Sequence, residues 1–168
     1  MMRWDVISRL LRNPTSGAEL GVFKGKFSEP MLKAHPKLTL YAVDTWMVRP
    51  PSDRVGFETY GGRDFREIRK VFDQCTKRFG NRVVVLQMDT VAAAGQVPDA
   101  SLDFVFIDAE HTYEAVGADI DAWRGKVKPG GILSGHDYAH SRFPGVKQAV
   151  DERFTPKTGD DHVWWVRC

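Results

Sequence analysis

The sequence predicts a doubly wound α/β fold, in which a mostly parallel sheet carries helices on both faces. Short apolar runs without polar alternation recur along the chain, as expected of strands that are covered on both sides. They occupy residues 18–23, 38–43, 83–88, 102–107, 130–135 and 162–166. The segments between them repeat apolar residues every three or four positions, which is the period of a helix with one buried face. Strands that alternate with helices form right-handed crossovers and a parallel sheet.

Four segments have a helical apolar period. Two long apolar stripes are formed by Phe65, Ile68, Phe72, Cys75 and Phe79, and by Val116, Ile120, Trp123 and Val127. Thr112 is the expected N-cap of the second of these helices, and the Pro129-Gly130-Gly131 run is expected to stop it. Shorter stripes begin at Trp4 and at Val146, behind Pro144.

Length and composition indicate one domain spanning residues 1–168, large enough to bury most of its apolar surface. Two cysteines, Cys75 and Cys168, argue against a disulfide framework and fit a reducing cytoplasm. The charged amino terminus and the short apolar runs argue against export and against a membrane span. A net charge of +2 with interleaved acids and bases gives weak support for a nucleic-acid partner.

One connection, residues 45–64, contains paired prolines and paired glycines and has no clear period. Loops of this length in a compact domain are usually functional or disordered. We expect a lid over the strand ends, and a mobile surface loop is the alternative.

The turn after the first strand favours one class of cofactor. Dinucleotide sites need glycines that let a pyrophosphate approach the backbone, but Phe23 stands at the second glycine position. The turn offers Glu19, Gly21 and Gly25 instead. This arrangement suits a ligand that lacks a pyrophosphate and has a cationic amino-acid end, such as S-adenosylmethionine.

Acids also follow the second and third strands. Asp44 is placed to accept hydrogen bonds from both ribose hydroxyls, and Thr45 beside it is grouped with the cofactor-binding residues. Asp89 is placed to meet an adenine amino group. A single acid at a strand end can equally be a helix cap or part of a solvated turn, but three in order are harder to explain in that way.

These motifs resemble the class I S-adenosylmethionine-dependent methyltransferases, especially their small-molecule and sugar O-methyltransferase branch. The resemblance runs from Gly17 to Arg167 and is carried by AELGV, GKFS, VDTW, FIDAEHTYE and GGILSGHDY in this order. It implies a minimal Rossmann-like sheet and S-adenosylmethionine as the cofactor. The chain is short at the amino end, where relatives often carry a substrate-binding extension, so the acceptor is left open. A second subunit could supply that cover, which would make the protein a homo-oligomer.

The fourth and fifth strands end on Asp108 and on His136-Asp137, and neighbouring strand ends lie about 4.8 Å apart. Carboxylates brought together repel unless a proton or a cation intervenes, and Mg²⁺ suits them. The resemblance implies Mg²⁺ at Asp108 and Asp137, with His136 as a softer ligand that also admits Mn²⁺ or Fe²⁺. The alternatives are that Asp108 caps the next helix while His136-Asp137 forms a turn, or that the same residues act without a metal.

His111 lies three residues beyond Asp108 and matches a histidine that acts as general base in some sugar methyltransferases. A structural role near a helix start is the alternative for His111. Tyr138 and His140 are expected to line the acceptor pocket, whereas His35 and His162 are expected to be packing or surface residues. Trp164-Trp165 is expected to belong to the core.

The leading hypothesis is transfer of a methyl group from S-adenosylmethionine to a hydroxyl of a small molecule or sugar. An RNA methyltransferase on the same fold is one rival. Enzymes that methylate DNA amino groups usually carry Pro-Pro and an aromatic residue after the fourth strand, and this chain has DAEH there. A cofactor-binding subunit without catalysis is the other rival.

Overall fold

The computed structural model describes residues 2–47 and 64–168, and its strands form one sheet. Within these residues the sheet has seven strands in the order β3-β2-β1-β4-β5-β7-β6. The strands are β1 (Ser16–Leu20), β2 (Thr39–Val43), β3 (Val83–Leu86), β4 (Leu102–Ile107), β5 (Val127–Gly135), β6 (Lys157–Thr158) and β7 (Trp164–Arg167). The first five strands of the chain are parallel to their neighbours among one another, and β7 runs antiparallel to both β5 and β6. The predicted doubly wound, mostly parallel sheet is confirmed.

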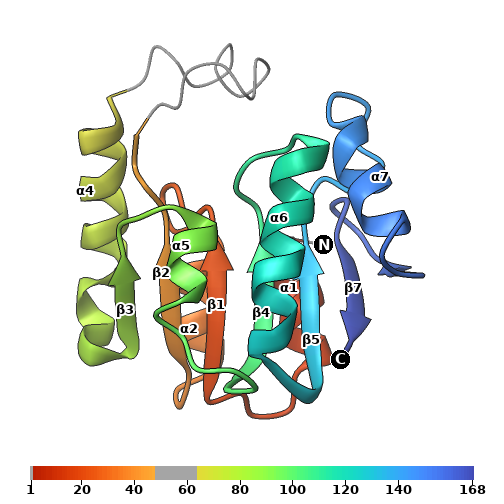
Figure 1. Ribbon diagram of the computed structural model, residues 1–168. Helices are drawn as coiled ribbons and strands as arrows, with labels where there is room; N and C mark the ends of the chain where they lie inside the picture. The colour runs from red at the N-terminus through yellow and green to blue at the C-terminus, as the bar shows by residue number, and fades with distance from the viewer. Residues whose placement is uncertain (1, 48–63) are drawn as a thin grey trace.

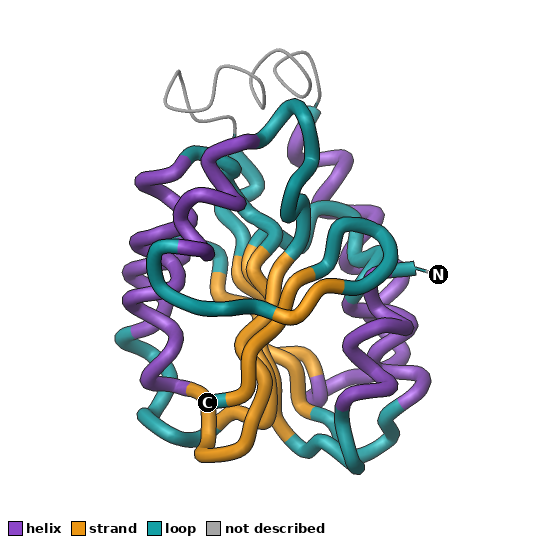
Figure 2. The backbone as a smooth tube through the Cα atoms, turned by 90° about the vertical axis from the view of Figure 1, so that its right-hand side faces the viewer, coloured by secondary structure: helices purple, strands orange, loops and turns teal. Residues whose placement is uncertain are grey.

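Helices cover both faces of this sheet, which Figure 2 shows edge-on between two helical layers. The helices are α1 (Arg3–Leu10), α2 (Ser28–Ala34), α4 (Phe65–Thr76), α5 (Thr90–Ala94), α6 (Tyr113–Trp123) and α7 (Pro144–Asp151), with 3-10 turns η1 (Lys77–Arg82) and η2 (Arg124–Lys126). In Figure 1, α5, α6 and α7 lie in front of the sheet, and α1 and α2 lie behind it. None of the helices in the described part of the chain has the length and apolar character that a membrane crossing requires.

The two faces of β4 show why its sequence has no polar alternation. Val105 and Ile107 face the core under α5, α6 and α7, whereas Phe104 and Phe106 face the core under α1 and α2. All four side chains are buried. Burial on both faces removes the solvent-facing positions that would otherwise be polar.

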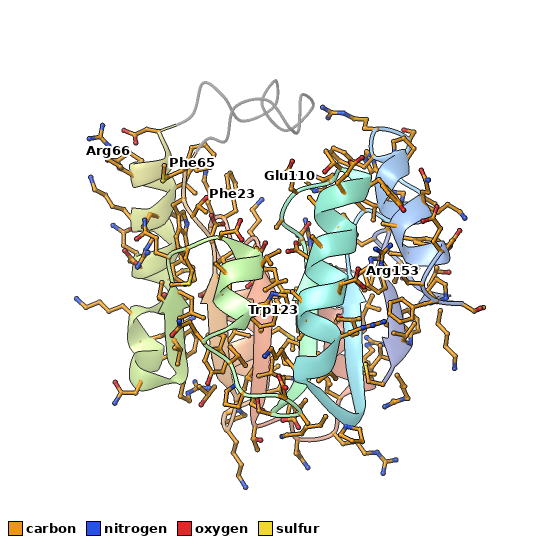
Figure 3. The ribbon with its side chains drawn as sticks, in the orientation of Figure 1. Phe23, Phe65, Arg66, Glu110, Trp123 and Arg153 are labelled. Atoms are coloured by element: carbon orange, nitrogen blue, oxygen red, sulfur yellow. The ribbon has the colours of Figure 1, made fainter. Side chains whose placement is uncertain are left out.

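Side-chain contacts hold the front helices together. The Trp123 indole Nε1 donates a hydrogen bond to the Thr90 carbonyl at 2.8 Å, which ties α6 to α5 (Figure 3). Arg153, which follows α7, pairs with Asp121 of α6 at 3.0 Å. Thr112 caps α6 by accepting a hydrogen bond from the Ala115 amide, as predicted.

Some element boundaries differ from the prediction. The apolar stripe expected to carry α6 to Val127 ends at Trp123, and Pro129-Gly130-Gly131 lies inside β5 and does not stop a helix. The pairing of β4 with β5 jumps from Leu102↔Val127 to Phe104↔Ile132, so these residues form an irregular, bulged stretch. Proline is tolerated at a bulge because the missing N–H breaks no ladder hydrogen bond there. The helices α2 and α5 were not predicted, and residues 48–63 of the predicted lid lie outside the described residues.

Candidate active site at the carboxyl ends of the strands

The candidate site lies where the strand order reverses, between β1 and β4. Backbone hydrogen bonds continue past the strand ends: Gly21 N–H donates to Val43, Asp108 N–H to Leu20 and His136 N–H to Ile107, at 2.8 to 3.0 Å. These bonds hold the residues that follow β1, β4 and β5 side by side. In open α/β sheets this crevice is the usual place for a ligand.

A cavity of about 600 Å³ opens at this edge of the sheet. Figure 3 shows three of its lining residues, Phe23, Phe65 and Glu110, at the end of the molecule where the parallel strands finish. Nearly all the predicted site residues line it: Glu19, Gly21, Asp44, Thr45, Asp89, Asp108, His111, His136 and Asp137. Gly25 is the exception among them. The volume of the cavity is in the range typical of small-molecule sites.

The turn after β1 brings backbone close to backbone. Gly21 has φ +84°, and a Cβ there would lie 2.1 Å from the Asp108 carbonyl oxygen, so only glycine fits. Phe23 also takes a left-handed conformation, at φ +53°. Gly25 lies outside the cavity lining, under Cys75 and Phe72, where its φ of +76° turns the chain toward α2.

Glu19 is an almost fully buried acid on the α2 side of β1, with an exposed fraction of 2%. Its carboxylate accepts a hydrogen bond from the Ser28 hydroxyl. Burial raises the pKa of Glu19 well above its usual range, because the charged form loses its hydration, and the Ser28 hydrogen bond opposes this only in part. Glu19 therefore holds its proton to a higher pH than an exposed glutamate does.

Asp44, which directly follows β2, holds the turn after β1 in place. Its two carboxylate oxygens accept hydrogen bonds from the amides of Phe23, at 2.8 Å, and Trp46, at 2.7 Å. The Trp46 indole in turn donates to the Phe23 carbonyl at 2.9 Å. Burial raises the pKa of the Asp44 carboxyl, and these amide hydrogen bonds counteract part of the rise. The acid thus fixes the loop and also faces the cavity.

Asp89 combines a capping role with a place in the cavity wall. Its side chain accepts a hydrogen bond from the Ala92 amide at 3.0 Å and so caps α5. The capping alternative is therefore correct for this residue, and it does not exclude a ligand contact because Asp89 also lines the cavity.

The acids after β4 and β5 converge as predicted. Asp108, His111 and Asp137 each offer a donor atom, and these three atoms lie within 4.8 Å of one another. His111 Nε2 lies 3.0 Å from Asp137 Oδ2, and His136 Nδ1 lies 3.1 Å from the same oxygen and 3.5 Å from Asp108 Oδ1. The structure thus places His111 with the predicted ligands. Since Thr112 caps α6, the alternative in which Asp108 caps that helix is wrong.

Arg3 is part of this cluster, and sequence reasoning missed it. Its Nη1 contacts Asp108 Oδ2 and lies 3.3 Å from His136 Nδ1. The contact with Asp108 joins residues that are 105 positions apart. The sequence carries no local signal that places a residue of the first helix at the end of the fourth strand.

The cluster balances its charges through these contacts. Burial disfavours the charged form of His136, but hydrogen bonds to Asp108 and Asp137 outweigh that effect and raise its pKa to about 10. Burial would raise the pKa of Asp137, yet hydrogen bonds from His111 and His136 hold it well below the usual range. Asp137 is therefore a carboxylate and His136 an imidazolium at neutral pH.

The cluster has the donor chemistry of a divalent-cation site. Two carboxylates and an imidazole are a common ligand set, and carboxylate oxygens suit Mg²⁺ and Mn²⁺. Among the described residues, the buried side-chain atoms without a hydrogen-bond partner are Glu110 Oε1 and His136 Nε2, and both residues line the cavity. His136 Nε2 lies 3.7 Å from Asp161 Oδ1, whereas Glu110 Oε1 is a buried acceptor of the kind that a ligand site presents.

The remaining predicted residues divide between the cavity and the packing around it. His140 lines the cavity, whereas the Tyr138 hydroxyl turns to Asp151 of α7 at 2.7 Å, outside the cavity lining. His111 stacks on Phe143, with ring centroids 4.1 Å apart. The expected packing roles are observed for the following residues: His35 pairs with Ser8, His162 packs on His140, and Trp164 and Trp165 lie against the core.

Comparison with known proteins identifies the family of the chain. A family model described as a methyltransferase domain matches residues 18–138. An uncharacterised protein, y4gI from Sinorhizobium fredii, is 29% identical over 97 residues, which are 58% of this chain and 10% of that relative. The chain therefore corresponds to a small part of that protein.

Solved structures that share the fold include the following three. The O-methyltransferase NovP has a TM-score of 0.75 at 19% identity, over 98% of this chain and 78% of its own. CalS11, a TDP-rhamnose 3'-O-methyltransferase of calicheamicin biosynthesis, has a TM-score of 0.64 at 18% identity, over 98% and 76%. An N1-methyltransferase from Burkholderia thailandensis, solved with S-adenosylhomocysteine, has a TM-score of 0.62 at 15% identity, over 98% and 75%. The family model matches more than half of the chain, and the chain therefore belongs to the methyltransferase domain family.

Proposed function

We propose that this enzyme methylates a hydroxyl group of a small molecule or sugar with the help of a divalent cation. The observation that carries the proposal is the convergence of Asp108, Asp137 and His111 at the edge of the cavity, with donor atoms within 4.8 Å of one another. An arrangement of this kind suits methyl transfer to a hydroxyl oxygen, because the carboxylates can hold a cation beside that oxygen and the imidazole can accept its proton.

The cofactor end of the cavity is assigned to the residues after β1, β2 and β3. We assign the ribose to Asp44 and the adenine to the neighbourhood of Asp89, with Glu19, Gly21 and Thr45 completing that end. All five line the same cavity. Because Asp44 is held by two backbone amides, its carboxylate is fixed before any ligand binds, so little ordering cost remains on binding.

When bound, S-adenosylmethionine supplies an electrophilic methyl group, and a divalent cation supplies a Lewis acid for the acceptor oxygen. Asp108 and Asp137 would hold that cation, and His136 would join them as a ligand only after it loses its proton. His111 takes the hydroxyl proton. Its imidazole is oriented for this role by the Asp137 carboxylate, 3.0 Å away, and by stacking on the Phe143 ring. The acceptor would contact His140 and Phe143 on the same side of the cavity.

The likeness to NovP, an O-methyltransferase, and to CalS11, a TDP-rhamnose 3'-O-methyltransferase, favours an acceptor of this class. The test is methyl transfer from labelled S-adenosylmethionine to a panel of phenols, sugars, nucleotide sugars and RNA, with Mg²⁺ and with a chelator. Label in a phenol or sugar that disappears on chelation supports the proposal. Transfer to RNA alone, or at full rate in chelator, would contradict it.

A further inference from the structure

Arg3 lies within the proposed metal site, although the proposed function gives this residue no role. Its guanidinium contacts Asp108 Oδ2 and lies against His136 Nδ1 inside the cavity wall. We propose that Arg3 is a tethered competitor of the divalent cation, so that the cation binds the acid pair only when the guanidinium leaves Asp108. This inference rests on the proposed metal site and goes beyond it by assigning a role to the first helix.

The packing of the first helix places Arg3 beside Asp108. Val6 and Ile7 of α1 are buried in the core that α1 shares with α2, which fixes the helix behind the sheet (Figure 1). The Arg3 amide donates to Asp161 Oδ2 at 2.9 Å, and its Nε lies 3.8 Å from the same oxygen. The backbone of Arg3 is thus anchored, and only the side chain has to rotate for the guanidinium to leave.

The carboxylate oxygens of the proposed metal site already have hydrogen-bond or ion-pair partners. Asp108 Oδ2 contacts Arg3, Asp108 Oδ1 lies 3.5 Å from His136, and Asp137 Oδ2 lies between His111 and His136. An arginine beside buried carboxylates supplies the positive charge that the pair would otherwise lack. A cation that binds here must therefore displace a charge already in place.

Competition of this kind lowers the apparent affinity by the fraction of molecules in which the site is open. A hydrogen bond between charged groups in a partly buried site keeps most molecules in the closed state. Removing the guanidinium should then tighten cation binding about ten- to hundredfold, or roughly 1.4 to 2.8 kcal/mol at 1.4 kcal/mol per factor of ten.

The test is titration of the purified protein with Mn²⁺, with free Mn²⁺ measured by electron paramagnetic resonance. Arg3→Gln is expected to bind Mn²⁺ at least tenfold more tightly than the wild type. Arg3→Met keeps an apolar stem that can pack beside the cavity, and it should also bind Mn²⁺ at least tenfold more tightly than the wild type. It serves as a second variant in case Arg3→Gln folds poorly. The matched control is Arg9→Gln on the same helix. Arg9 is exposed and pairs with Asp5, so the Mn²⁺ affinity of this variant should match the wild type.

The outcomes separate this inference from the metal site itself. If Asp108→Asn in the Arg3→Gln background abolishes the tight binding, the competition occurs at the predicted acids. Equal Mn²⁺ affinity in the wild type and in both Arg3 variants would overturn the competition and leave the metal site standing. Absence of Mn²⁺ binding in every variant would overturn both, and S-adenosylhomocysteine binding would then show whether the cofactor site is intact.

Discussion

Gly21→Ala tests whether the backbones of β1 and β4 meet at the site as closely as described. An alanine Cβ would lie 2.1 Å from the Asp108 carbonyl oxygen and 2.5 Å from the Ala109 Cα, both backbone atoms that cannot rotate away. Left-handed backbone costs an alanine about 1 to 2 kcal/mol. Overpacking adds about 1 to 3 kcal/mol, so the expected loss of unfolding free energy is roughly 2 to 5 kcal/mol.

Gly130→Ala is the matched control for this substitution. Gly130 has φ +82°, close to the +84° of Gly21, but a Cβ there meets nothing within 4 Å. The control should therefore lose only the conformational part, about 1 to 2 kcal/mol. Urea denaturation gives both values, and S-adenosylhomocysteine affinity should fall in Gly21→Ala alone, because Asp108 must move. Equal losses of stability, within about 0.5 kcal/mol, would refute the close approach.

Three further predictions concern the metal, the base and a buried acid. Chelation should abolish turnover but leave S-adenosylhomocysteine affinity within about twofold, since the cation serves the acceptor oxygen; turnover at full rate in chelator would give the acids another role. His111→Ala should lower kcat by about 10²- to 10⁴-fold at unchanged cofactor affinity, while His35→Ala, remote from the cavity, should not; a loss of Mn²⁺ affinity in His111→Ala would make this residue a ligand. Glu19→Gln should raise the unfolding free energy at pH 7 to 8 by about 1 to 3 kcal/mol. The pKa of Glu19 is raised in the folded state, so wild-type stability falls as pH rises above the ordinary carboxyl range, and thermal unfolding of the variant should lack that fall; parallel pH profiles for the two proteins would be inconsistent with a protonated Glu19.

The sheet could be predicted because burial on two faces leaves an unmistakable apolar run. The acids could be predicted because residues that directly follow parallel strands share one edge of the sheet. Asp44, Asp108 and Asp137 needed no side-chain detail for this placement. The predicted helix stop at Pro129 was wrong. The helical apolar period continues as far as Val127 in the sequence and so hid the true end of the helix, and the bulge in β5 lets a proline lie within a strand.

The parts that could not be predicted depend on tertiary contacts. The five residues of α5 are too few to display a helical period. Arg3 reaches Asp108 only because Val6 and Ile7 fix α1 in the core, and no spacing within the sequence encodes that reach. Tyr138 was placed in the pocket by its position after β5, yet its hydroxyl finds Asp151 instead. Strand-end geometry therefore predicts backbone positions better than it predicts side-chain directions.

The most direct test of the central claim is calorimetric titration of S-adenosylhomocysteine into the wild type and Asp44→Ala. The cavity at the strand ends predicts binding of one equivalent by the wild type. Loss of the carboxylate should weaken binding by about one to two powers of ten, since hydrogen bonds to a charged group contribute roughly 1.5 to 3 kcal/mol. Folding of the variant is checked by its thermal unfolding, because Asp44 also holds the Phe23 and Trp46 amides. Unchanged affinity in folded Asp44→Ala, or no binding by the wild type, would contradict the assignment of the cofactor to this cavity.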